Sequence, residues 1–217
     1  MIDELPVIRR RAFERPARHK VQELEGTPTG FVVDALGGTG ALDYRIKAAI
    51  PEFSHFCGIA LTCDAGPADN LALIHALADL EPGDVLVANA HGHRACAITG
   101  DLLLGMARNS GAVGFVTDGC VRDLPGIRKV GLPAFCVGVT PNSPNRSGPG
   151  TVGFPIMLAG QLVCSGDVVI ADQDGVVVVP QALLEETLER LDGIRAAEAR
   201  ADQSVREGAR LPAFFKR

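Results

Sequence analysis

The feature that most constrains the fold is an alternation of two hydrophobic patterns along the first two-thirds of the chain. Short apolar runs of strand length alternate with segments whose apolar residues recur at helical spacing. The predicted strands are 57–63, 85–89, 113–117 and 133–139, and the predicted helices are 31–36, 71–78, 97–110 and 124–130. This order of elements predicts a layered α/β domain.

The pattern changes after a polar loop at 140–150. Short strands joined by turns then predict a β-meander over 151–156, 161–164, 168–171 and 176–179. From Gln181 to about Gly208 the spacing is helical, and the later half is polar, as in a helix that reaches over a neighbouring subunit or into solvent. We therefore expect an α/β fold with parallel and antiparallel strands and a long C-terminal helix.

Chain length and charge narrow the organisation further. The 217 residues suit one domain with extensions. We expect a helical arm at 1–26, a domain at 27–180, and a C-terminal helix and tail at 181–217 that crosses to a neighbouring subunit. The formal net charge is -5, which argues against nucleic-acid binding despite a basic first segment. No apolar run reaches the length of a membrane span, so we expect no membrane association.

The six cysteines indicate the redox environment. None forms a C-x-x-C pair, and most lie inside apolar runs, so we interpret them as buried reduced thiols. Charged residues interrupt the N-terminus, where a signal peptide would need an apolar run. These observations predict a cytoplasmic protein.

The first candidate site is the segment from Thr99 to Leu103, at or near a predicted helix N-terminus. Such ends expose unpaired N–H groups and the positive end of the helix dipole, and they therefore receive carboxylates and enolates. The alternative is purely structural: Thr99 caps the helix, and Asp101 complements its dipole.

The second candidate site is the segment from Asp118 to Asp123, directly after an apolar strand. Ligand sites gather at the ends of strands in α/β folds. Asp123 suits a hard cation such as Mg²⁺, and Arg122 offers a bidentate fork to a carboxylate or a 2-oxo acid. The alternative is that Asp123 only caps the helix that begins at Leu124 and Pro125.

Histidines offer a third possibility, at His55, His75, His91 and His93. His91 and His93 with Cys96 suggest zinc, but a second ligand cluster at zinc spacing is missing from the sequence, so zinc is the weaker interpretation. His75 falls among helical apolar positions and is interpreted as semi-buried. The sequence contains no G-x-S-x-G motif, phosphate loop or dinucleotide motif.

Asp101, twenty intervening residues and Arg122-Asp123 form the pattern D-x(20)-R-D. Together with the segments 111–123, 33–37, 69–70, 82–87, 166–172 and 174–180, it resembles the 4-hydroxy-4-methyl-2-oxoglutarate aldolase family. That family overlaps the proteins called regulator of ribonuclease E activity A. The likeness runs from about Thr27 to Pro180 and depends on the order and spacing of the pieces. The chain departs from the family's frequent residues at Asn89, at 91–93 and at Ser165.

The resemblance implies a swivelling β/β/α fold, a homotrimer or homohexamer, and a site between subunits. In it Asp123 would bind Mg²⁺ or Mn²⁺, and Asp101 would hold a metal-bound water. The residues implied to contact the substrate are Gly100, Leu102, Leu103, Arg122 and Asn70. A glutamate from the C-terminal helix of a neighbouring subunit would complete the water shell, and the candidates are Glu198 first, then Glu185, Glu186 and Glu189.

The activity implied by the resemblance is metal-dependent retro-aldol cleavage of a 4-hydroxy-2-oxo acid. The substrate would be of the 4-hydroxy-4-methyl-2-oxoglutarate or 4-carboxy-4-hydroxy-2-oxoadipate type, and the products pyruvate and a 2-oxo acid. Oxaloacetate decarboxylation would be a side activity. Two alternatives stay open: a non-catalytic regulator that binds ribonuclease E, and a related metal lyase acting on another sugar-derived acid.

Overall fold

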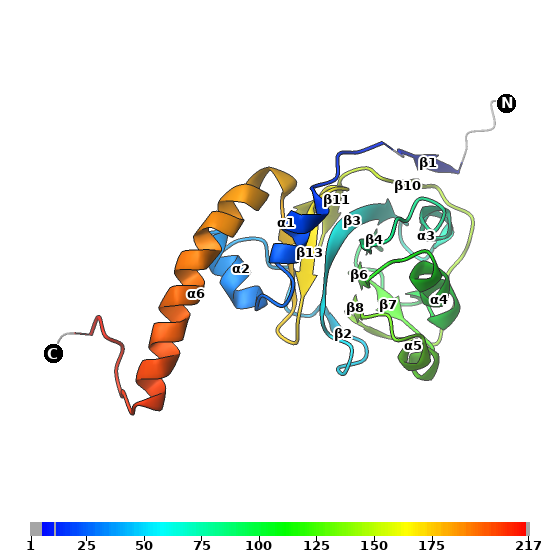
Figure 1. Ribbon diagram of the computed structural model, residues 1–217. Coiled ribbons are helices and arrows are strands. Elements are labelled where there is room, and N and C mark those ends of the chain that lie inside the picture. The colour runs from blue at the N-terminus through cyan, green and yellow to red at the C-terminus, as the bar shows by residue number, and fades with distance from the viewer. Residues whose placement is uncertain (1–5, 11, 216–217) are drawn as a thin grey trace.

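Four parallel strands form the centre of the main sheet in the computed structural model, which describes residues 6–10 and 12–215 (Figure 1). They are β3 (Phe56–Asp64), β4 (Asp84–Asn89), β6 (Gly114–Thr117) and β8 (Ala134–Cys136), in that order. The outer strands are β1 (Val7–Arg9), β2 (Lys47–Ala48), β10 (Gly150–Val152), β13 (Val168–Ala171) and β14 (Val176–Val179). Of these, β10 and β13 run antiparallel to β3, and β2 runs antiparallel to β8.

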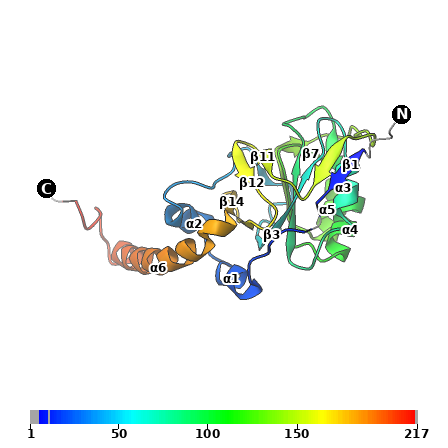
Figure 2. The ribbon, with the colours of Figure 1, turned by 90° about the horizontal axis from the view of Figure 1, so that it is seen from above.

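Three helices cover one face of this sheet, as both views show (Figures 1 and 2). They are α3 (Leu71–Ala76), α4 (Asp101–Asn109) and α5 (Leu124–Val130). Their buried side chains form a core with the sheet that includes Leu73, Leu104, Ile127, Leu61, Leu86 and Phe115. Burial of such side chains is the main stabilising term of the layer. Because α4 packs against α5, the segments that begin these two helices lie close together.

The opposite face of the sheet carries a hairpin of β11 (Ile156–Leu158) and β12 (Gln161–Val163), seen on the far side of β3 from the helices in Figure 2. A second core joins it to the sheet through Ile156, Leu158, Val163, Val85, Val87 and Val116. A further small sheet consists of β5 (Ala97–Thr99), β7 (Cys120–Val121) and β9 (Gly138–Val139). The predicted layered α/β fold with mixed sheets is thereby confirmed.

The remaining helices lie beyond β13 and β14. They are α1 (Arg18–Glu23), α2 (Thr29–Ala35), a 3-10 turn η1 (Gln181–Leu183) and α6 (Leu184–Arg206). Leu184 and Leu191 of α6 pack in one cluster with Val32 and Ala35 of α2. The second half of α6 is exposed and projects away from the sheets (Figure 1). The predicted long C-terminal helix is confirmed.

The structure corrects the prediction at the N-terminus. Residues 1–26 were expected to form a helical arm, of which 1–5 and 11 lie outside the described residues. The described part instead contains the strand β1, which pairs in parallel with β10, before the short helix α1. Bonds from Arg9 to both carboxylate oxygens of Asp79, at 2.5 and 2.7 Å, hold this segment to the body.

Three further boundaries differ from the prediction. The helix expected over 97–110 begins only at Asp101, because 97–99 is a buried strand and Gly100 has extended backbone. The strand expected over 133–139 divides into β8 and β9, which belong to different sheets. The strand expected over 151–156 divides into β10 and β11, because Gly153 turns the chain at a φ of +82°.

All six cysteines are free, and four of them are buried, which confirms the prediction of reduced thiols. Among the helices that the structure describes, none combines the length and the apolar character needed to cross a membrane.

Candidate functional site

The small sheet brings the two predicted site segments together. Its strands β5 and β7 are parallel, so the segments that follow them leave the sheet at the same edge. The Arg122 N–H donates to the Thr99 carbonyl at 3.1 Å, which fixes the two segments side by side just before the site residues. The structure therefore places Gly100 and Asp101 next to Arg122 and Asp123.

Gly100 is the point of closest approach. A Cβ atom built there would overlap the Asp123 Oδ2 and would lie 3.2 Å from the Arg122 Cγ. Its backbone is extended, with φ -144° and ψ -166°, so any residue could adopt the conformation. Glycine is needed because the Asp123 carboxylate occupies the space where a side chain would stand.

The N-terminus of α4 has no side-chain cap. Gly100 is its N-cap residue, and the first intrahelical bond is donated by Leu104 to the Gly100 carbonyl at 3.2 Å. The amides of residues 101–103 therefore precede the helical bonding pattern and remain available to a ligand. The alternative that Thr99 caps the helix is wrong, because its hydroxyl lies 3.4 Å from the Gly100 carbonyl instead.

Asp123 begins α5 through its backbone and not through its side chain. Its carbonyl accepts bonds from the N–H groups of Gly126 and Ile127, and no side-chain cap is formed. The residue has left-handed backbone, with φ +63°, a conformation that aspartate tolerates better than most residues. The side chain is 47% exposed, and its Oδ2 lies 3.3 Å from the Arg122 Nε. The carboxylate is thus left accessible to a cation, which argues against the capping alternative.

A second glycine, Gly126, leaves room for the Asp101 side chain. A Cβ atom at Gly126, in the first turn of α5, would overlap the Asp101 Oδ2 and lie 2.5 Å from its Cγ. The Asp101 carboxylate therefore packs against the backbone of Gly126, three residues after Asp123. Sequence reasoning missed Gly126, since nothing local distinguishes this glycine from a loop residue.

Asn70 is buried beside the same segment. Its Nδ2 donates to the Ile98 carbonyl at 3.0 Å, and its backbone N–H donates to the Asn145 carbonyl at 3.1 Å. The side chain is 3% exposed, and among the described residues its Oδ1 has no hydrogen-bond partner. An unpaired buried acceptor is costly unless a water or a ligand supplies the donor. Asn70 is therefore bonded to the segment two residues before Gly100, and its Oδ1 can accept a further hydrogen bond.

The polar loop at 140–149 closes the other side of the cluster. Arg122 donates from Nη1 to the Ser143 hydroxyl at 2.6 Å. The loop is anchored by Asp69, whose Oδ2 accepts the N–H groups of Ser147 at 2.7 Å and Gly148 at 3.1 Å. The sequence predicted a polar loop here, but it did not predict the contact of Ser143 with Arg122 or the role of Asp69 in the loop.

Glu198 is not brought to this cluster. It lies on the exposed half of α6, and α6 packs on α2 beside β13 and β14, at the far end of the main sheet from α4 and α5 (Figure 1). Within one chain, the structure therefore assembles Gly100, Asp101, Leu102, Leu103, Arg122, Asp123 and Asn70, and leaves Glu198 apart.

Asp118 and His91 have structural partners. The two carboxylate oxygens of Asp118 accept the N–H groups of Ala90 at 2.6 Å and Gly92 at 2.8 Å, so this aspartate orders the turn at 90–92. The His91 Nε2 lies 2.8 Å from the Asp64 Oδ1. Within the described ranges, no cluster of three or more His, Cys, Asp or Glu side chains could hold a metal ion by itself.

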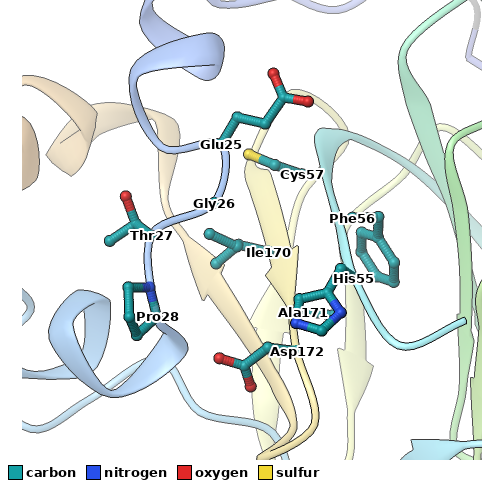
Figure 3. Close-up of a pocket in the computed structure, with 10 residues that line it drawn as sticks. All are labelled: Glu25, Gly26, Thr27, Pro28, His55, Phe56, Cys57, Ile170, Ala171 and Asp172. Atoms are coloured by element: carbon teal, nitrogen blue, oxygen red, sulfur yellow. The ribbon is translucent and has the colours of Figure 1, made fainter. Parts of the chain in front are cut away.

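A separate hollow of about 360 Å³ lies between the α1–α2 linker and β13 (Figure 3). Burial, followed by the charge of Glu25, raises the pKa of the Cys57 thiol to about 12, which leaves it protonated and unreactive at neutral pH. Asp172 accepts bonds from the N–H and the hydroxyl of Thr29, each at 2.8 Å. The thiol and the carboxylate of this hollow are therefore a poor basis for catalysis.

Comparisons with known proteins identify the family of the chain. A family model described as "RraA-like: Aldolase/RraA" matches residues 29–178. A Halalkalibacterium halodurans protein named "Putative 4-hydroxy-4-methyl-2-oxoglutarate aldolase" is 35% identical over 189 residues, which is 87% of each chain.

Two solved structures show the same fold. The RNA-processing inhibitor RraA from Thermus thermophilis gives a TM-score of 0.66 at 27% identity, covering 71% of this chain and 93% of that one. Streptomyces coelicolor RraAS2, an unusual member of the RNase ES inhibitor RraA family, gives 0.78 at 29% identity, covering 88% and 100%. Since the family model spans most of the chain and includes the cluster at 99–123, the chain belongs to the RraA-like family.

Proposed function

We propose that the protein is a lyase that cleaves a 4-hydroxy-2-oxo acid to pyruvate and a second 2-oxo acid. The substrate is of the 4-hydroxy-4-methyl-2-oxoglutarate or 4-carboxy-4-hydroxy-2-oxoadipate type. The observation that carries the proposal is the packing of Asp123 and Arg122 against Gly100, at the uncapped N-terminus of α4. A carboxylate for a cation, a guanidinium for an anion and free amides for a carboxylate thus share one edge of the fold. The name of the bacterial relative supports the same class of reaction.

The donor set fits Mg²⁺ or Mn²⁺. The Asp123 carboxylate is half-exposed, and Asp101 presents a second carboxylate from the start of the neighbouring helix. Mg²⁺ commonly binds proteins through one or two carboxylates and otherwise keeps its waters. When bound, the cation would supply Lewis-acid polarisation of the 2-oxo group.

Three groups of the protein take the other roles in the proposed reaction. The Arg122 guanidinium stabilises the negative charge that develops on the pyruvyl oxygen as the C3–C4 bond breaks. The amides of Leu102 and Leu103 receive the C1 carboxylate, which the helix dipole also favours. Asp101 holds a water that accepts the proton of the C4 hydroxyl. Because oxaloacetate loses carbon dioxide to give the same pyruvate enolate, this arrangement predicts oxaloacetate decarboxylation as a side activity.

A second copy of the chain completes the site in this proposal, within a homotrimer or homohexamer. The cluster is open in the single chain, where the Leu102 side chain is 74% exposed and Met106 is 51% exposed. The projecting half of α6 is polar and exposed, which suits contact with a neighbouring copy. That contact would carry Glu198 to the neighbour's site.

The test is release of pyruvate from 4-hydroxy-4-methyl-2-oxoglutarate and from oxaloacetate, with Mg²⁺ and with EDTA. We expect turnover with Mg²⁺ and its loss with EDTA. Asp123→Ala is expected to abolish turnover without unfolding the protein, because the side chain neither caps α5 nor lies in the core, and the only structural cost is that of alanine at a positive φ. Arg122→Ala is expected to be as damaging. Full wild-type activity in EDTA would refute the metal role.

A non-catalytic regulator that binds ribonuclease E is the second candidate, and the likeness to two RraA structures favours it. Pull-down of purified ribonuclease E by the wild-type protein, together with no pyruvate release from either acid, would support this function. A related lyase for another sugar-derived acid is the third candidate. It predicts Mg²⁺-dependent release of pyruvate from such an acid and none from the two test substrates.

A further inference from the structure

Ser143 contacts the guanidinium on which the proposed reaction depends. Its hydroxyl accepts a 2.6 Å hydrogen bond from the Arg122 Nη1, and the Arg122 Nε lies 3.3 Å from the Asp123 Oδ2. Two of the three guanidinium nitrogens are therefore engaged before any ligand arrives. A guanidinium has five N–H donors, so the remaining donors stay available to a substrate oxygen.

The backbone around Ser143 is fixed on both sides. On one side, the Asn142 carbonyl accepts the Ala97 N–H at 3.0 Å, and its Nδ2 donates to the Ala95 carbonyl at 2.8 Å. On the other side, the Asn145 N–H donates to the Ala68 carbonyl at 2.7 Å. These bonds hold the backbone on both sides of Ser143 and so bring its side chain to Arg122, although the residue itself is exposed.

We propose that Ser143 is a positioning residue, which fixes the plane of the Arg122 guanidinium before substrate binds. The consequence for turnover rests on the proposed function. Arginine is flexible along its stem, and holding one corner of its fork reduces the freedom that must be lost when the fork meets an anion. Orientation established in advance lowers the barrier of the chemical step more than it strengthens ground-state binding.

The first measurement is steady-state pyruvate release with Mg²⁺. Ser143→Ala is expected to lower kcat by on the order of 10-fold with a smaller change in KM, since small misplacements of an orienting group act mainly on the chemical step. Ser143→Thr keeps the hydroxyl and is expected to restore most of kcat. Ser147→Ala is the matched control, because Ser147 bonds to Asp69 through its backbone N–H and not through its side chain.

The second measurement does not depend on activity. The ¹⁵N relaxation of the Arg122 Nε–H group, assigned by its loss in Arg122→Lys, reports how rigid the guanidinium is. In Ser143→Ala the order parameter is expected to fall below about 0.6, the flexible range, and in Ser147→Ala it is expected to stay at the wild-type value.

Each outcome decides a separate question. An unchanged order parameter in Ser143→Ala overturns the positioning role, whatever the kinetics show. A lowered order parameter with wild-type kcat in an active enzyme overturns it as well, because the restraint would then not matter for turnover. If the wild type releases no pyruvate, the proposed function fails, and a lowered order parameter would still support the contact between Ser143 and Arg122 as a restraint.

Discussion

Replacing Gly126 by alanine tests the position of the Asp101 carboxylate without removing it. The new Cβ atom would overlap the Asp101 Oδ2 and would lie 2.5 Å from the Asp101 Cγ and 2.6 Å from the Asp101 Cβ. The carboxylate must therefore rotate away, and the first turns of α4 and α5 must also move slightly apart, because rotation does not move Cβ. Gly126 lies in the first turn of α5 and does not have positive φ, so the backbone accepts alanine without strain. The substitution therefore moves a proposed catalytic carboxylate and leaves its chemistry intact.

The expected loss of stability is modest because two terms oppose each other. Alanine in place of glycine inside a helix stabilises by up to about 1 kcal/mol. Rotating the Asp101 carboxylate and moving the first turns of α4 and α5 apart costs about 1–3 kcal/mol. The melting temperature should therefore fall by no more than about 8 °C in a domain of this size. A displaced acid–base group, in contrast, typically lowers kcat by about 10²-fold or more.

The assay is Mg²⁺-dependent pyruvate release, with a thermal melt on the same samples. Gly105→Ala is the matched control: it makes the same change in the neighbouring helix α4, where the new Cβ would meet only the Val130 Cγ2, at an ordinary 3.6 Å. A Gly126→Ala protein with wild-type kcat and an unchanged melt would refute a catalytic role for the Asp101 carboxylate. Equal losses of kcat in both variants would point to general disturbance of the helix pair.

Two further predictions concern stability. Arg15→Met leaves the fully buried Asp84 carboxylate without its cation. It should lower the free energy of unfolding by about 3 kcal/mol, or the melting temperature by about 6–12 °C. The control Arg18→Met loses only an exposed bond to the Pro82 carbonyl and should cost much less. Burial raises the pKa of Asp84 despite the contact with Arg15. The contribution of Asp84 to folding stability therefore falls as pH rises above 3.8. Calorimetry should find that Arg15→Met loses more stability at pH 8 than at pH 5. Burial alone would raise the pKa of Asp172, but bonds from Thr29 lower it below 3.8, so its stabilising effect is present above that value and lost as pH falls further. Asp172→Asn should therefore cost about 1 kcal/mol at pH 7 and flatten acid denaturation, and a wild-type acid profile in this variant would contradict the assignment.

Local signals predicted the elements that depend on neighbours in sequence. The helix after Asp123 follows from Leu124-Pro125 at its start and Gly131 at its end, and the structure confirms it as α5. The strand at 85–89 follows from its apolar run between turn residues. The motif D-x(20)-R-D located the cluster, because its spacing is the distance along the chain between two segments that start neighbouring helices.

Contacts between residues far apart in the sequence could not be predicted from the sequence. The sequence at 97–99 continues smoothly into a helical pattern, and only its pairing with β7, more than twenty residues later, makes it a strand. Gly126 matters because it packs against Asp101, and Ser143 matters because it bonds to Arg122. Neither contact is visible in the sequence around these residues. The placement of Glu198 against a site depends on a second copy of the chain, which a single sequence does not describe.

The buried Asp69 carboxylate ties the start of α3 to the loop at 140–149, through bonds from the N–H groups of Leu71, Ser147 and Gly148. All three donors are backbone groups, so the frame of the loop does not depend on which side chains it displays. The exposed side chains of the loop can consequently change while the frame persists. Substitutions at exposed positions of the loop other than Ser143 should therefore leave this frame intact, and under the proposed function they offer a route to a different choice of acid.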